Sequence, residues 1–130
     1  MVIAGELTQE QTELLFAHLP IGIGFSVADE EDVVRFWAGG GFSSCSPQLI
    51  GRTLYGCHPK RAHSAIESLL ADLKSGTKDE VDTIEHGENG AERIIYTALR
   101  DAGGTYRGVL ETVVPVDESG PAEDAGERSV

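Results

Sequence analysis

The sequence predicts an α+β domain in which helices cover one face of a five-stranded antiparallel sheet. Two segments, residues 8–19 and 60–74, repeat apolar residues with helical spacing. Five other segments alternate in the way that strands do, two between the predicted helices and three after the second one. Short turns join consecutive strands, which favours antiparallel pairing. With 130 residues, of which 40% are hydrophobic, the chain has the size of one globular domain.

The first helix is predicted over residues 8–19. Thr8 and Gln11 have the spacing of a capping box, in which each side chain bonds the backbone of the other. Pro20 follows the last turn, as expected after a helix end. The predicted helix is amphipathic, because leucines recur along one side of it: Leu7, Leu14, Leu15 and Leu19.

A β-hairpin is predicted next. Large apolar residues alternate with small residues over 21–28, which predicts a strand with one buried face. Residues 29–32 form an acidic turn, and residues 33–37 form the returning strand. Residues 38–59 are rich in glycine and serine, so we expect loops with short helical turns there.

The second helix is predicted over residues 60–74 and ends at Ser75-Gly76, a common helix terminator. Its apolar face consists of Ile66, Leu69, Leu70 and Leu73. Three strands are predicted after it, over residues 80–85, 92–99 and 106–116. In the last strand, alternation at Val109, Glu111 and Val113 is typical of an antiparallel sheet with one covered face.

The formal net charge of −12 restricts the partners that this chain can bind. Such a surface repels the phosphates of nucleic acids and anionic membrane surfaces, so we expect neither as a partner. No segment approaches the roughly 18 to 20 consecutive apolar residues of a membrane span. Residues 117–130 hold five acidic residues and one Arg, which predicts a disordered acidic tail after a domain over residues 1–116.

The sequence predicts a cytoplasmic protein. Arg35 is the first basic residue, so the start of the chain lacks the basic region of a secretion signal. Cys45 and Cys57 could form at most one disulfide. Without a secretory context, we expect both to be thiols in a reducing compartment.

Several motifs make this chain resemble the PAS domain family. The element order fits that fold, and the motifs are Gly51-Arg52, Cys57-His58-Pro59, Arg100-Asp101 and the run from Tyr106 through Gly108 to Leu110-Glu111. Together they resemble a subgroup found with bacterial hemerythrin-like HHE domains. The chain departs from that subgroup at residues 60–63 and 115–117. The resemblance implies a stand-alone sensory and signalling domain, not an enzyme, that binds a small molecule between the sheet and the middle helices.

Heme b is the most specific ligand that the resemblance suggests, with gas or redox sensing as its purpose. His58, His63 and Cys57 would be the candidate iron ligands, because imidazole and thiolate both serve as axial ligands. Each has an alternative: His58 could bond a helix start or a loop carbonyl, His63 could be a core histidine, and Cys57 a small buried apolar residue. Residues proposed to line the pocket are Ile66 and Leu70, whereas Arg52 could meet a propionate or form an ion pair with the Arg100-Asp101 segment.

Two other functions remain open at this point. A ligand-free module for protein partners would be favoured if large side chains filled the pocket: Phe25, Phe36, Trp37 and Leu70. A small enzyme would need a carboxylic acid in a concave pocket, for which Asp82 and Glu111 are the candidates. In either sensory case we expect a homodimer through the N-terminal helix, whose leucine stripe is otherwise hard to bury.

Overall fold

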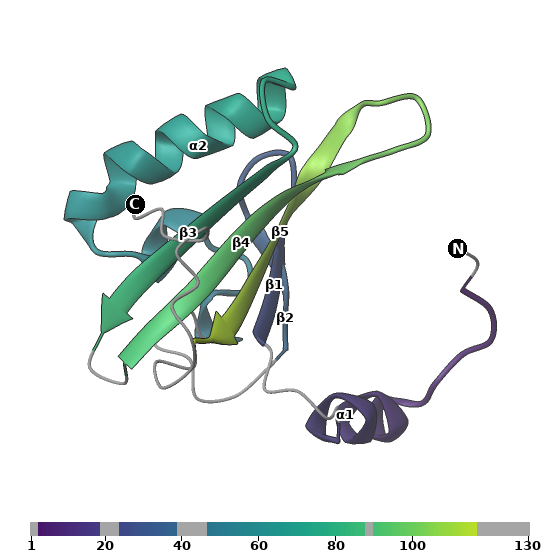
Figure 1. Ribbon diagram of the computed structural model, residues 1–130. Helices are drawn as coiled ribbons and strands as arrows, with labels where there is room; N and C mark the ends of the chain where they lie inside the picture. Colours follow the sequence, from purple (N-terminus) through teal and green to yellow (C-terminus); the bar gives the residue numbers. More distant parts are fainter. Residues whose placement is uncertain (1–2, 19–23, 39–46, 88–89, 117–130) are drawn as a thin grey trace.

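The computed structural model describes residues 3–18, 24–38, 47–87 and 90–116 (Figure 1). The predicted acidic tail and residues 19–23 and 39–46 lie outside the described residues. The elements are α1 (Gln9–Ala17), β1 (Gly24–Ala28), β2 (Val34–Ala38), the 3-10 helices η1 (Pro47–Leu49), η2 (Leu54–Cys57) and η3 (Lys60–Ala62), α2 (His63–Ser75), β3 (Glu80–Gly87), β4 (Gly90–Arg100) and β5 (Tyr106–Pro115). The predicted fold class and element order are confirmed.

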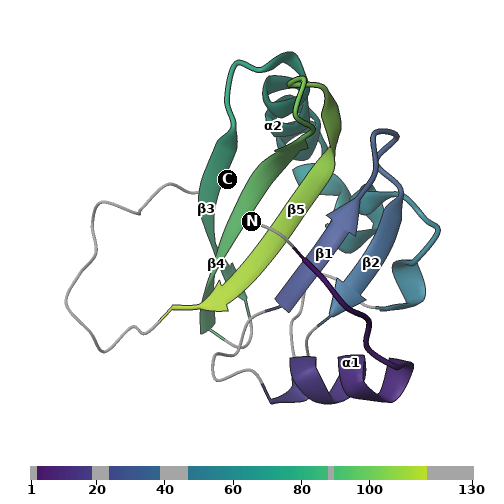
Figure 2. The same ribbon diagram turned by 90° about the vertical axis from the view of Figure 1, so that its right-hand side faces the viewer.

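The five strands form one antiparallel sheet in the order β2-β1-β5-β4-β3. The hairpins β1–β2, β3–β4 and β4–β5 join neighbours in sequence, whereas β1 pairs with β5 in the middle of the sheet. α2 lies across one face, and α1 lies beside the starting end of β1 (Figures 1 and 2). The core between the sheet and α2 is formed by Ala28, Val34, Leu54, Ile66, Leu69, Leu70, Leu73, Ile94, Tyr96, Val109 and Val113.

β1 turns its small side chains toward the core. Gly24, Ser26 and Ala28 are buried, while Phe25 is partly exposed on the opposite face of the sheet. The ring of Phe16 in α1 packs at 6.2 Å from that of Phe25 and at 5.9 Å from that of Phe36. Phe25 and Phe36 therefore contact α1 and do not fill the space between the sheet and α2, which corrects the filled-pocket arrangement considered above.

α1 begins with the predicted capping box. Thr8 Oγ1 accepts from Gln11 N–H, and Gln11 Oε1 accepts from Thr8 N–H. The helix ends at Ala17, because His18 takes a non-helical conformation and its Nδ1 lies 2.8 Å from the carbonyl oxygen of Leu14. That contact places the imidazole of His18 at the end of the helix.

The middle segment is held against the edge of β2. Val34 N–H donates to the Arg52 carbonyl, and the Val34 carbonyl accepts from Gly51 N–H, both at 2.8 Å. Leu54 N–H donates to the Asp32 carbonyl at 2.7 Å. These bonds satisfy part of the edge strand and fix the position of η2, which leads directly into His58.

Candidate functional site

Among the described residues, four polar side chains lie close together inside the apolar core. Ser26, His58, Tyr96 and Glu111, here called the buried polar cluster, are exposed by only 4%, 7%, 1% and 1%. Burying polar groups costs free energy unless they find partners, and a carboxyl group costs most. The cluster is therefore the feature of the core that packing alone does not explain.

The sheet register brings three members of the cluster into one row. Glu111 of β5 pairs with Ser26 of β1 on one side and with Tyr96 of β4 on the other. Side chains of directly opposed residues lie on the same face of a sheet, close enough to interact. The row is thus centred on β5, the middle strand of the sheet, beneath the helical layer.

His58 joins the row from the helical side. Ser26 Oγ donates to Glu111 Oε1 at 3.1 Å, and His58 Nε2 lies 3.8 Å from Glu111 Oε2. The same nitrogen lies 3.4 Å from the hydroxyl of Tyr96. The contact with Tyr96 is at the long end of the hydrogen-bonding range and that with Glu111 is beyond it, so both are weak. His58 therefore links the segment between η2 and η3 to the sheet through contacts that are easily exchanged.

The imidazole of His58 is neutral at physiological pH. Burial, together with a smaller effect of the nearby imidazole of His63, lowers the pKa of His58 to about 4. The adjacent carboxyl of Glu111 would favour the charged form, but at 3.8 Å its attraction does not outweigh the lost hydration. The His58–Glu111 contact is therefore not an ion pair in the usual sense.

His63 holds the backbone on which His58 stands. Its Nε2 lies 2.9 Å from the carbonyl oxygen of Tyr55 and 3.2 Å from that of His58. Both partners are acceptors, so we assign a proton to Nε2. The ring also packs edge-on against Tyr55, with 5.4 Å between centroids. His63 therefore clamps the turn that carries His58.

The remaining residues predicted for the ligand site occupy different places. Ile66 and Leu70 are buried in the core on α2, as predicted. Arg52 is exposed in the turn beside β2. Cys57 ends η2, but its side chain lies outside the described part of the structure, as do Cys45 and the side chain of His86. The structure thus buries His58, Ile66 and Leu70 and leaves Arg52 at the surface.

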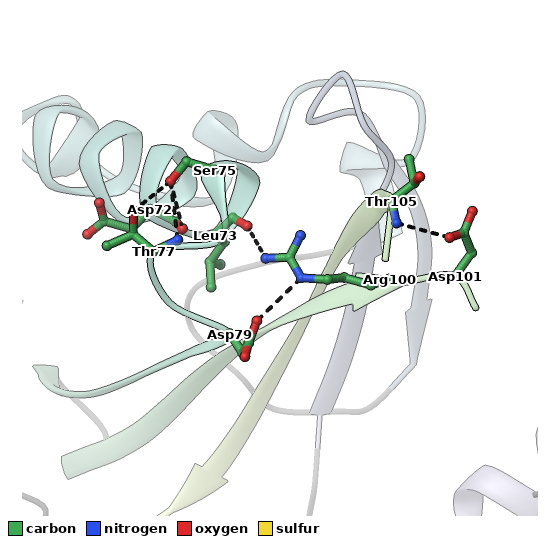
Figure 3. Close-up of polar contacts among 8 residues, drawn as sticks. All are labelled: Asp72, Leu73, Ser75, Thr77, Asp79, Arg100, Asp101 and Thr105. Carbon is green, nitrogen blue, oxygen red and sulfur yellow. Dashed lines mark hydrogen bonds and ion pairs between the residues drawn. The ribbon is translucent and has the colours of Figure 1, made fainter. Parts of the chain in front are cut away.

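Arg100 does not pair with the segments considered from sequence. Its Nε contacts Asp79 at 3.3 Å, and its Nη2 donates to the carbonyl of Leu73 at the end of α2 (Figure 3). Asp101 instead pairs with Arg107 at 3.1 Å. The expected ion pair involving Arg52 is therefore replaced by contacts that join β4 to the end of α2.

Sequence reasoning missed Ser26 and Tyr96 as members of a site and considered Glu111 only for an enzyme. The signal available was the alternation at Val109, Glu111 and Val113, which places a carboxyl group on a covered face. Asp82, the other acid considered, lies on the opposite face and pairs with Arg93. Of the two, only Glu111 is directed into the core.

The fold and the chain order of its elements match a known family. A family model described as "PAS domain" matches residues 12–117, which is most of the chain. This chain belongs to the PAS domain family. It is thus a sensory and signalling domain of a family that is typically not catalytic.

Solved structures agree with this assignment. The PAS domain matches the crystal structure of a C-terminal domain from Streptococcus mutans with 25% identity and a TM-score of 0.70, covering 90% of this chain and 91% of that one. It also matches a sensory box sensor histidine kinase from Vibrio cholerae at 11% identity and a TM-score of 0.57, covering 83% and 94%. Below 25% identity, such a match shows the fold alone.

A third match is to the structure of VqmA bound to DPO. Another matching structure is of VqmA from Vibrio cholerae. For the complex with DPO, identity is 22% and the TM-score 0.56, and the match covers 86% of this PAS domain and 59% of that chain. The comparison with curated proteins finds no match. Within the described residues, none of the helices is long and apolar enough to cross a membrane.

Proposed function

We propose that this PAS domain senses a small molecule that binds between the sheet and the helical layer, where the buried polar cluster recognises it. The cluster is the observation that carries the proposal. Glu111 and His58 are almost wholly buried, although burying either one lowers stability. Polar groups kept in a core at such a cost are candidates for recognition.

The position of His58 offers a route from ligand to signal. Its two contacts with the sheet are weak, so a ligand that bonds Glu111 or Tyr96 can replace them. Movement of His58 would displace the turn whose carbonyl groups His63 contacts. That turn leads into α2. A ligand that binds one arrangement better than the other would shift the position of α2.

Heme b remains the narrower prediction from the sequence, with His58 and His63 as iron ligands. The arrangement of the described residues does not fit heme binding well. Nε2 of His63 bonds two carbonyls, and Nε2 of His58 faces Tyr96 and Glu111. Among the described residues no Lys or Arg is buried to meet a propionate. The arrangement therefore favours a ligand other than heme.

A fragment and metabolite panel followed by two-dimensional NMR of the labelled protein tests the proposal. Binding should be saturable and should shift the amide signals of residues 26, 58, 96 and 111. Tyr96→Phe should weaken it, while Glu10→Gln on the exposed side of α1 should not. Panel members that shift only surface amides, with the same affinity for both variants, would contradict the proposal.

Hemin belongs in the same panel, with absorbance as the readout. A sharp Soret band at one-to-one stoichiometry that is lost in His58→Ala or His63→Ala would establish heme and name its ligand. A broad band that does not saturate and is unchanged in both variants would exclude heme and leave the other ligands of the panel in place.

A homodimer formed through α1 is the second part of the proposal, because its leucines remain exposed. Leu7, Leu14 and Leu15 are exposed by 54%, 51% and 47%, and apolar side chains in such number favour a protein contact. A ligand-free interaction module would use the same surface. The subgroup found with HHE domains, which the motifs quoted above support, and the cytoplasmic location both stay predictions.

A further inference from the structure

We infer that the ligand is a small neutral or positively charged nitrogen compound, an amine, amide or amidine, whose N–H group donates to Glu111. This inference rests on the proposed function, because it names the chemical class that the same site would take. The inference distinguishes ligands that donate N–H groups from anions. Anions such as carboxylates and phosphates would bind more weakly.

The charges inside the core carry the first step. Among the described residues, the buried polar or charged side chains are Ser26, His58, Thr83 and Glu111. Thr83 bonds the carbonyl of Ile94, and His58 is neutral, because burial lowers its pKa to about 4. A buried anion needs a cation or several donors nearby. Among the described residues no Lys or Arg is buried and the imidazole is neutral, so an anionic ligand would bind there at a high cost.

The geometry of Glu111 carries the second step. Its Oε1 accepts from Ser26 Oγ at 3.1 Å, which orients the carboxyl group from the β1 side. Its Oε2 is directed toward His58 Nε2, 3.8 Å away on the helical side. A ligand entering from the helical layer therefore meets an acceptor at hydrogen-bonding range once His58 moves aside. Hydrogen bonds from N–H donors to a carboxylate are among the stronger ones in proteins.

The row on either side of Glu111 suits a compact, partly aromatic ligand. Tyr96 is the register partner of Glu111, and Trp37 is that of Ser26, so both project from the core face of the sheet. Aromatic rings pack well against planar groups at an offset. Across the same row, β1 contributes only small side chains to the core. A ring that carries an amide or amidine group is thus a suitable probe.

The charge of the whole chain acts in the same direction. A formal net charge of −12 produces a negative potential around the domain, which raises the local concentration of cations and lowers that of anions. This effect concerns the approach to the site, whereas Glu111 acts on contact. The two are separable, because salt screens the first far more than the second.

Three probes that share one ring test the inference: benzamidine, benzamide and benzoate. Two-dimensional NMR of the intact chain should show that benzamidine and benzamide shift the amides of residues 26, 96 and 111, with benzoate bound about tenfold or more weakly. Glu111→Gln should reduce the affinity for benzamidine about tenfold, and Glu10→Gln should leave it unchanged. The preference should persist in high salt.

Benzoate binding in the core as tightly as benzamidine would overturn the inference and leave the proposed function intact. An unchanged preference in Glu111→Gln would do the same. If neither these probes nor any member of the wider panel shifts a core amide, the proposed function itself fails. Should Glu111→Gln lose the dispersed spectrum of a folded protein, the comparison of the three probes on the natural sequence still decides.

Discussion

His58 combines a chemical role with a cost to stability that can be measured. Burial lowers its pKa to about 4, from 6.5 for an exposed imidazole. The unfolded chain therefore binds a proton between these values that the folded protein does not. Stability should be fully retained above pH 6.5 and should fall as the pH drops toward 4, by up to about 3 kcal/mol at 1.36 kcal/mol per pKa unit.

Urea unfolding at several pH values checks this effect, with His58→Asn as the comparison. The variant lacks the titrating ring, so its free energy of unfolding should decline less between pH 6.5 and 4 than that of the natural sequence. Other groups titrate equally in both proteins, so the difference isolates His58. Parallel curves would show that folding does not change the protonation of His58 and would contradict the lowered pKa.

Gly108 occupies a position at which the fold cannot accept a side chain. Its φ is +147°, and an added Cβ would lie 2.2 Å from the carbonyl oxygen of Ala28, a backbone atom of β1. Gly108→Ala should therefore separate β1 from β5 and cost about 3 kcal/mol or more. This contact explains the glycine in the run from Tyr106 to Glu111, and chemical denaturation provides the measurement.

Gly103→Ala is the matched control for that prediction. A Cβ there would lie 3.5 Å from Asp101 Oδ1, an ordinary contact, so the change should stay within about 0.5 kcal/mol. Equal losses in the two variants would mean that glycine is needed in this region for a reason other than the approach of β1.

At the scale of elements, Arg100 connects β4 to the C-terminus of α2. Its guanidinium donates to the Leu73 carbonyl, contacts Asp79 and lies 5.9 Å from the centroid of the Tyr106 ring. A cation suits the carbonyls at the end of a helix. Arg100→Met keeps the apolar stem and removes these contacts, so it should cost roughly 1 to 2 kcal/mol.

Asp79→Asn separates the two contributions of Arg100. Asp79 is 86% exposed on its side chain, and exposed ion pairs contribute little. Its substitution should change the free energy of unfolding by less than about 0.5 kcal/mol. A loss as large as that of Arg100→Met would assign the effect to the ion pair and not to the end of α2.

The elements also show what could be predicted from the sequence. α2 was predicted closely, because four apolar residues at helical spacing and a terminating glycine specify both its face and its end. For β1, a period of two predicts a strand but does not decide which set of side chains faces inward. Ser26 and the small residues Gly24 and Ala28 face the core, because α1 covers Phe25 on the opposite face of the sheet.

The site was harder to predict than the fold for a related reason. Ser26, His58, Tyr96 and Glu111 are far apart in the chain, and their proximity depends on strand register and on how the middle segment follows the edge of β2. The sequence indicated His58 through its motif and Glu111 through alternation. The register between β1 and β5 is needed to place Ser26 beside Glu111, and the path of the middle segment is needed to bring His58 to them.

For the whole molecule, the proposed homodimer has to overcome a net charge of −12 on each copy. Two such chains repel one another, and salt screens this repulsion. Apolar contacts between the exposed leucines of α1 are not weakened by screening. An interface of this kind should therefore strengthen as salt is added, whereas one built on ion pairs would weaken.

Sedimentation equilibrium of the natural sequence and of Leu14→Glu/Leu15→Glu tests the interface. The natural sequence should form a dimer that tightens with salt, and the double variant should be a folded monomer, because both side chains are about half exposed and their loss leaves the core intact. Ile50→Glu makes the same chemical change at an equally exposed site away from α1 and should remain a dimer. Dissociation by Ile50→Glu but not by the double variant would transfer the interface to the segment beside β2, and α1 would then serve only to cover Phe25 and Phe36.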